Sequence, residues 1–194
     1  MFIRSERLFL RPAWPEDWAE LHAVIDDAQV VRNLARAPWP YAPEDARRFV
    51  NLPQDPRFPN FFVTLPGAHG SRLIGSVGLA EAEGGAVELG YWIARSQWGR
   101  GYATEAARAV LSVARAIGHD RIEANHFIDN PASGQVLRKL GFRPTGEWRP
   151  RYSEGRKQVC TAVMFEARLT AAGNGDDDGN DSGGGQSVEV MRAA

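Results

Sequence analysis

Hydrophobic and polar residues alternate over several short stretches of this 194-residue chain, a pattern that predicts β-strands. The clearest stretch is AVELGYWIA, in which every second side chain from Val87 to Ile93 falls on one strand face and those of Glu88 and Trp92 fall on the other. Two further runs flank the turn-forming cluster PGAHGS and predict a hairpin. The strands expected from alternation cover residues 7–11, 61–65, 73–79, 87–93 and 121–127, a stretch from 142 onward, and 158–169.

Elsewhere the apolar residues recur at helical spacing. The strongest example is QWGRGYATEAARAVLSVARAIG, whose small apolar residues predict a helix with one buried stripe, ended by Gly118. The stripe comprises Ala103, Ala106, Ala107, Val110, Leu111, Ala114 and Ile117.

Three other helices are expected. One opens at residues 15–17 and runs to about residue 26, and a short one covers 44–51 after the proline-broken loop APWPYAP. Another begins at Asn130 and Pro131, a favoured N-cap and first helical residue, and stops at Gly141. Its inner face carries Leu137 and Leu140.

This order of elements predicts one mixed α/β domain, with hairpins first and a strand–helix–strand–helix unit in the second half. The segment AAGNGDDDGNDSGGGQSVEV is nearly empty of large apolar residues, so it cannot bury enough surface to offset the entropy of ordering. We therefore expect a folded domain over residues 1–169 and a disordered tail over 170–194 that holds no catalytic residue.

Composition narrows the class of protein. The chain is 43% hydrophobic and 24% charged, as is usual for soluble globular proteins. The net charge is −1, but the last 25 residues hold five acids and one base, which leaves the body at +3, too weak a charge to indicate nucleic-acid binding. The opening residues lack a signal-peptide core, and no run approaches the roughly 18 apolar residues of a membrane span.

The only cysteine is Cys160, which excludes an internal disulfide and favours a reducing, cytoplasmic setting. Its place in an alternating strand predicts a small buried apolar residue rather than a nucleophile. The four histidines show no metal-ligand spacing, so no metal is expected.

The glycines Gly99 and Gly101 stand between a predicted strand and a predicted helix. The first N–H groups of a helix lack partners and carry partial positive charge, so such a turn can hold a phosphate. Tyr102 and Ala103 stand where a Walker motif needs Lys and Ser or Thr, and Thr104 stands where a dinucleotide motif needs a small residue. On the glycines alone, a tight turn that binds nothing is equally compatible.

Two longer motifs resolve this ambiguity. Residues 98–106 read WGRGYATEA and residues 130–142 read NPASGQVLRKLGF, and the chain opens with ERLFLRPAWPEDW. Residues 4–168 thereby resemble the GNAT superfamily of acyl-CoA-dependent N-acetyltransferases, in particular the branch of ribosomal-protein N-terminal acetyltransferases. Trp98 departs from the Gln or Arg of the wider superfamily, and Gly134 and Gln135 follow Ser133 where the branch often has a longer polar residue first.

The resemblance implies a central, mostly antiparallel sheet with flanking helices, in which the parallel strands 87–93 and 121–127 splay apart. It implies transfer of an acetyl group from acetyl-CoA to a primary amine, directly within a ternary complex. The pantetheine arm would pair with the strand at Tyr91, Trp92 and Ile93, and a backbone N–H near Trp92 or Ile93 would polarise the thioester carbonyl. The pyrophosphate would contact the backbone of Trp98, Gly99, Arg100, Gly101, Tyr102, Ala103 and Thr104.

The resemblance also assigns candidate chemistry to side chains. Glu88 is the candidate general base, with a solvated strand carboxylate as the alternative. Ser133 would donate to the departing thiolate, or be an inert first-turn serine. Asn130 would bind the pantetheine amide, cap its helix, or do both, and Lys139 would reach a CoA phosphate or remain solvated. We expect Glu105 to stabilise the helix N-terminus rather than to react.

The acceptor stays open at this level, because a protein N-terminus, an amino acid, a polyamine and an aminoglycoside all present amines. Trp39, Tyr41 and Asn125 are the candidate acceptor contacts, and Phe62, Trp148 and Tyr152 are further candidates for an aromatic wall. An acidic pocket formed by Glu81, Glu83 and Glu88 would favour a polycation. The alternatives are the same fold with another acyl-CoA, a non-catalytic CoA-binding module, or nucleotide binding; no nucleic acid or membrane partner is expected, and the chain would be a monomer or homodimer.

Overall fold

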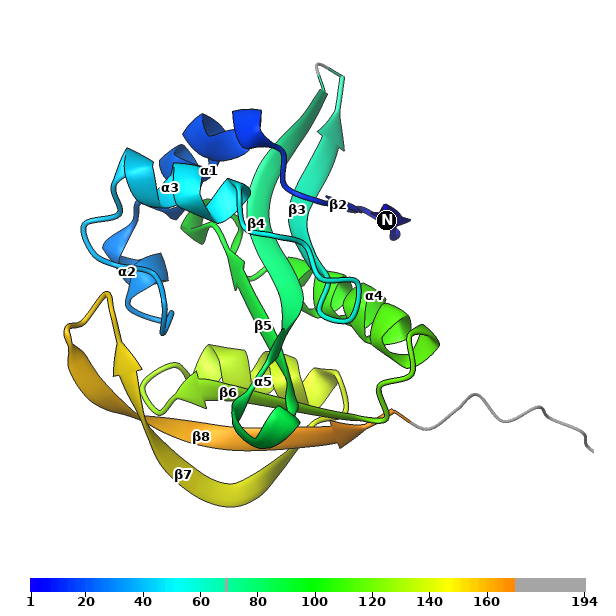
Figure 1. Ribbon diagram of the computed structural model, residues 1–194, viewed down its shortest axis with the longest axis vertical. Coiled ribbons are helices and arrows are strands. Elements are labelled where there is room, and N and C mark those ends of the chain that lie inside the picture. The colour runs from blue at the N-terminus through cyan, green and yellow to red at the C-terminus, as the bar shows by residue number, and fades with distance from the viewer. Residues whose placement is uncertain (69, 170–194) are drawn as a thin grey trace, which may run out of the picture.

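The computed structural model describes residues 1–68 and 70–169, which form one eight-stranded sheet flanked by helices (Figure 1). Every neighbouring pair of strands is antiparallel except β5 and β6, which are parallel. In sheet order the strands are β1 (Ile3–Arg4), β2 (Phe9–Arg11), β3 (Asn60–Gly67), β4 (Gly70–Glu81), β5 (Val87–Ile93), β6 (Arg121–Phe127), β8 (Gln158–Arg168) and β7 (Arg143–Ser153). The predicted fold class, including its parallel pair, is confirmed.

The helices pack on two sides of this sheet. They are α1 (Trp18–Ile25), α2 (Ala28–Val31), α3 (Pro43–Val50), α4 (Tyr102–Ala116) and α5 (Pro131–Lys139), with 3-10 turns at Pro15–Asp17, Glu83–Gly85 and Arg95–Gln97. In Figure 1, α1 to α3 gather away from α4 and α5. The two faces of β5 pack against different hydrophobic clusters. Leu89 and Ile93 belong to the cluster that includes residues of α4, and Trp92 packs against the cluster that includes residues of α1 and α3.

The stripe on α4 is buried at five of its seven predicted positions, from Ala106 to Ala114. Small side chains there let the helix lie close to the sheet. Ala103 is only half-buried, and the prediction for Ile117 is wrong, because the helix ends at Ala116 and leaves Ile117 38% exposed. Gly118, with φ +93°, then turns the chain toward β6, as its position predicted.

The N-terminal third differs from the prediction in detail. The expected helix over 15–26 is divided into a 3-10 turn and α1, and α2 and β1 were not expected. Four helical residues or two strand residues carry too few positions to show a period. A buried ion pair between Arg11 and Asp17, with both N–O contacts at 2.7 Å, ties β2 to the start of α1.

No helix in the described part of the chain is long and apolar enough to cross a membrane. The predicted tail, residues 170–194, lies outside the described residues.

Candidate active site

The parallel strands β5 and β6 pair at one position only, Glu88 with Glu123, and then diverge (Figure 1). On its other side β5 pairs with β4 along its whole length. The N–H of Ala94 donates to the Ile74 carbonyl on β4 at 2.7 Å, and hydrogen-bonded and non-bonded positions alternate along an antiparallel pair. The backbone groups of Tyr91 and Ile93 therefore point away from β4, into the opening toward β6. This is a strand edge inside a sheet, available to an extended, amide-containing ligand.

The glycine turn lies at the end of β5, directly before α4. Gly99 and Gly101 have φ values of +75° and +81°, which L side chains rarely adopt, and Gly101 is the N-cap of the helix. An added Cβ would meet nothing within 4 Å at Gly99 and only the Arg7 guanidinium, at 3.5 Å, at Gly101. The Trp98 indole donates to the Ile93 carbonyl at 2.7 Å, so it fastens the turn to the strand edge. The turn thus presents bare backbone at the positive end of a 15-residue helix.

The connection between β1 and β2 holds this turn in place. The Glu105 carboxylate accepts hydrogen bonds from the Ser5 hydroxyl and the Arg7 backbone N–H, each at 2.7 Å, and forms an ion pair with the Arg7 guanidinium. Arg7 also donates to the Arg100 carbonyl at 3.0 Å and lies over the Tyr102 ring. Burial alone would raise the pKa of Glu105, but the hydrogen bonds from Arg7 and Ser5 outweigh it and lower that pKa. Glu105 is therefore a structural anchor, and the roles of Ser5 and Arg7 were not visible in the sequence.

Tyr91 and Ser133 meet across the opening, where their hydroxyl oxygens lie 2.8 Å apart. The Ser133 N–H donates to the Asn130 side chain at 3.4 Å, so Asn130 is the N-cap that the sequence predicted. Burial raises the pKa of Tyr91 to about 12, although the hydrogen bond with Ser133 opposes the shift. The phenol is therefore protonated at neutral pH and can donate a hydrogen bond.

Glu88 lies on the opposite face of β5, away from α4. Both of its carboxylate oxygens are engaged by the Arg151 guanidinium, at 2.7 and 2.9 Å, and Asn125 donates to one of them at 3.1 Å. The side chains of Glu88 and Arg151 are 17% and 26% exposed. Sequence reasoning placed Glu88 and Asn125 near the reaction but missed Arg151, which β7 brings from 63 residues away.

Gly90 lies between Glu88 and Trp92 on this face and is exposed. An added Cβ there would meet nothing within 4 Å, so there is open space directly above the strand. Because side chains two apart on a strand share a face, this space lies between the positions of Glu88 and Trp92.

Comparison with known proteins accords with this geometry. The model of the acetyltransferase (GNAT) domain family matches residues 7–143. The chain belongs to the GNAT acetyltransferase family. It is 26% identical over 169 residues to "Uncharacterized N-acetyltransferase p20" of Bacillus licheniformis, an alignment that covers 84% of this chain and 93% of that protein. Because the GNAT domain is present and this relative is named an N-acetyltransferase, we identify the chain as an acetyl-CoA-dependent N-acetyltransferase.

Solved structures agree with the family assignment. A GNAT-family acetyltransferase from Bacillus anthracis superimposes with a TM-score of 0.73 at 27% identity, over 87% of this chain and 98% of that one. The RimL ribosomal L7/L12 α-N-protein acetyltransferase, solved in complex with coenzyme A, shares the fold with a TM-score of 0.72 at 21% identity, over 87% and 98% of the two chains.

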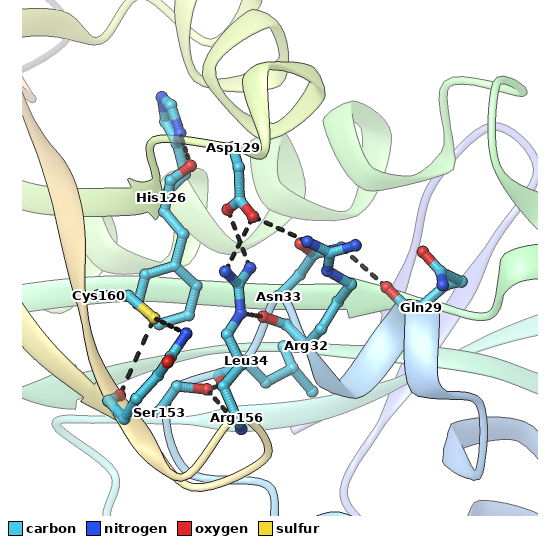
Figure 2. A network of polar contacts seen from close by, with 11 residues as sticks. Gln29, Arg32, Asn33, Leu34, His126, Asp129, Ser153, Arg156 and Cys160 are labelled. Atoms are coloured by element: carbon cyan, nitrogen blue, oxygen red, sulfur yellow. Dashed lines mark hydrogen bonds and ion pairs between the residues drawn. The ribbon is translucent and has the colours of Figure 1, made fainter.

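In this GNAT domain, the turn between β7 and β8 closes over the segment that follows α2 (Figure 2). Arg156 donates to both oxygens of Asp129 at 2.8 and 2.9 Å, and Arg32 donates to the same carboxylate at 2.8 Å. Hydrogen bonds from Arg156, together with the charges of both arginines, lower the pKa of Asp129 despite partial burial. Because Asp129 immediately precedes Asn130, the two arginines fix the start of α5.

Backbone contacts reinforce this closure. The Ser153 hydroxyl donates to the Leu34 carbonyl at 3.1 Å (Figure 2). The Glu154 N–H donates to the Ala35 carbonyl at 2.8 Å. Gly155 must be glycine, because an added Cβ would lie 2.6 Å from a methyl carbon of Val31.

The departure at Gly134 from the GNAT motif also has a steric explanation. An added Cβ at Gly134 would lie 2.6 Å from the His126 imidazole on β6. The histidine and the glycine therefore fit together as a pair, and a longer residue at 134 would require His126 to move.

The aromatic candidates for the acceptor wall are dispersed. Tyr41 is only 5% exposed and belongs to the core cluster of α1 and α3, as does Phe62, so the structure places both inside the domain. Burial, with the neighbouring Asp45 charge, raises the pKa of Tyr41 to about 12. Trp148 and Tyr152 are exposed on the face of β7 opposite to Arg151. Trp39, in the loop before α3, is 37% exposed.

Lys139 lies at the C-terminal end of α5, in a cavity with Arg115 and Arg168. This position favours the solvated charge, one of the two roles expected for Lys139, over a contact with the turn that precedes α4. The prediction for Cys160 needs correction. Cys160 is half-buried rather than buried, and it packs against the small cluster of Phe127 and Met164. No group of His, Cys, Asp and Glu side chains within residues 1–68 and 70–169 could hold a metal ion.

The raised pKa of Tyr91 predicts a pH dependence of folding. Between pH 10, where an unfolded tyrosine ionises, and about pH 12, the folded state keeps this proton and the unfolded state loses it. The free energy of unfolding therefore falls across this window, by at most about 1.4 kcal/mol per pH unit from this group. Urea unfolding at pH 9 to 12 should show a shallower fall for Tyr91→Phe. The exposed-site variant Tyr152→Phe is the control, and equal slopes for all three proteins would contradict the prediction.

Proposed function

We propose that this protein acetylates the α-amine at the N-terminus of a protein or peptide, by direct transfer from acetyl-CoA within a ternary complex. The observation that carries the proposal is the pair of adjoining features at the end of β5: an open strand edge leads to a bare-backbone turn at a helix N-terminus. The first suits the amides of the pantetheine arm, and the second suits the pyrophosphate.

The residues present fit coenzyme A. The backbone of residues 98–104 would hold the phosphates, with Arg100 exposed beside them. The edge at Tyr91 and Ile93 would bind the pantetheine arm, and the N-cap position of Asn130 supports a further contact with its amides. Bound acetyl-CoA supplies the thioester carbonyl as the electrophile.

The chain's own groups would assist the transfer from both sides of β5. Tyr91 and Ser133 form a hydroxyl pair that can donate a proton or a hydrogen bond to the departing sulfur. Glu88 and Asn125 are available on the acceptor side, next to the open space above Gly90. A backbone N–H that points into the opening would polarise the thioester carbonyl.

The state of Glu88 supports an α-amine as the acceptor. Its oxygens already accept hydrogen bonds from Arg151 and Asn125, so it can take a proton only by weakening these contacts. At pH 7 about one α-amine in ten is already neutral, against about one lysine side chain in 2,500. An α-amine therefore needs the least help from such a base.

Polycationic acceptors are disfavoured by the same contacts. The suggested acidic pocket would need Glu81 beside Glu88, but Glu81 stands opposite Val87, one position along from Glu88, so its side chain lies on the other face of the sheet. Arg151 adds a positive charge next to Glu88. RimL, a structural neighbour, is named as an α-N-protein acetyltransferase, which agrees with the acceptor class proposed here.

Binding of the donor is tested by Gly101→Val. Besides straining the backbone, the added side chain fills the approach to the first N–H groups of α4. We expect calorimetric titration to show acetyl-CoA affinity reduced by more than tenfold. Gly118→Val is the matched control, because Gly118 has φ +93° and open surroundings but lies at the far end of α4. Equal affinities for the two folded variants would contradict the assignment of the turn.

The acceptor and the role of Glu88 are tested together by CoA release. The wild type should acetylate a peptide with a free N-terminus. It should not acetylate the same peptide when the N-terminus is blocked and only a lysine side chain offers a free amine. Glu88→Gln should lower kcat by about 10²-fold, the low end of the usual contribution of a general base because an α-amine needs little help, without changing acetyl-CoA affinity.

Glu166→Gln is the control, since Glu166 forms an ion pair with Arg121 and is separated from Glu88 by the intervening strand β6. Turnover of the blocked lysine peptide alone would refute the α-amine assignment. Full activity of Glu88→Gln would reduce Glu88 to a structural partner of Arg151.

A further inference from the structure

A second, strongly positive cavity lies outside the acetyl-transfer site. It has a volume of about 230 Å³ and is lined by the C-terminal half of α4, the end of α5 and the end of β8. Four cationic side chains surround it: Arg108, Arg115, Lys139 and Arg168. Its lining holds no acidic residue, and within the described parts of the chain none of the four forms an ion pair.

This basic cleft, as we call the cavity with its four cations, is remote from the phosphate-binding turn. The turn precedes the first residue of α4, whereas Arg115 stands in its last turn, and a helix of 15 residues is about 22 Å long. Lys139 likewise lies at the end of α5 opposite to Asn130. In Figure 1 this end of both helices lies beside the point where the described chain ends after β8.

Helix dipoles account for only part of the arrangement. A cation in the last turn of a helix is stabilised by the free carbonyls, which suits Arg115 and Lys139. Arg108 lies in the middle of α4 and Arg168 lies on a strand, so neither has this explanation. Like charges around one cavity repel one another, and an anion bound among them relieves the repulsion.

We propose that the acidic segment 176–181 of this same chain binds in the basic cleft. Leu169, the last described residue, is itself part of the cleft wall. Asp176 follows it by seven residues, a span of at most about 25 Å when extended, so the segment can reach every part of the cleft. The segment carries Asp176, Asp177, Asp178 and Asp181 and no base, which matches four cations with four carboxylates.

The acidic segment is covalently attached to the wall of the basic cleft, and this attachment favours binding. A ligand attached through a short connection binds as if it were present at millimolar concentration, so weak ion pairs suffice for occupancy. The contact neutralises the basic cleft and shields it from other polyanions. Because the cleft is separate from the turn and from Glu88, acetyl transfer proceeds at the same rate with the segment bound or released.

The test is NMR on the full-length ¹⁵N-labelled protein. The backbone amides of Ser112, Gly141 and Ala167 report on the cleft. Wild type is compared with a variant in which Asp176, Asp177, Asp178 and Asp181 are all replaced by Asn. At 50 mM NaCl the three amide signals should differ between the two proteins, and at 1 M NaCl, where the screening length is about 3 Å, they should coincide.

Reversing the charges of the cleft and of the acidic segment tests whether ion pairs between them cause the shifts. Arg115→Glu with Arg168→Glu should abolish the salt-dependent shifts of the three signals, and adding Asp176→Lys, Asp177→Lys and Asp178→Lys should restore salt dependence. Arg4→Glu with Arg72→Glu changes the net charge equally at two exposed arginines outside the cleft and should leave the shifts in place. Identical spectra of wild type and the Asn variant at 50 mM NaCl would overturn the proposal, as would shifts that grow with protein concentration, since these indicate the acidic segment of a second copy.

Discussion

The divergence of β5 from β6 is the constraint on which the rest of this structure depends. A sheet normally pairs every interior strand on both sides, because an unpaired backbone group inside a protein is costly. Here the two parallel strands pair only at Glu88 and Glu123, and the backbone of Tyr91 and Ile93 is turned toward the opening. Such an edge persists only if the elements around it hold the two strands apart.

Long-range contacts hold the opening from both ends. Glu105, Ser5 and Arg7 fix the N-terminus of α4 to the first hairpin, and the Trp98 indole ties the turn to Ile93. On the other side, Asp129 and its two arginines fix the start of α5 to the β7–β8 turn (Figure 2). The two helix N-termini that flank the opening are therefore anchored by chain segments remote in sequence, and their spacing is set before any ligand arrives.

The same architecture places two groups of polar side chains on opposite faces of β5. Because side chains alternate along β5, Tyr91 meets Ser133 on the helix side while Glu88 meets Arg151 and Asn125 on the open side. A hydroxyl pair and a carboxylate then stand on either side of the strand edge. Under the proposed function the hydroxyl pair would serve the donor and the carboxylate the acceptor in a direct transfer, and half-buried Cys160 lies outside both groups.

Features set by neighbouring residues could be predicted from the sequence, and features set by sheet order could not. The α4 stripe, the Asn130 cap and the positive-φ glycines depend on contacts within one or two turns, so the local pattern was sufficient. The pairing of Glu88 with Arg151 depends on β7 returning to the outer edge of the sheet, which no local pattern specifies. The two roles left open for Lys139 have a related reason: its motif position was clear, but the direction in which α5 runs from the opening was not.

The most direct test of this account is amide hydrogen exchange along β5, measured by NMR with and without coenzyme A. Gly90 and Trp92 donate toward β4 and should be protected in both states, while Tyr91 and Ile93 should exchange quickly in the free protein and slowly once coenzyme A is bound. This alternation of unchanged and newly protected amides is specific to a ligand that pairs as an added strand. Unchanged exchange of Tyr91 and Ile93 in the saturated complex would show that the opening is not where the donor binds.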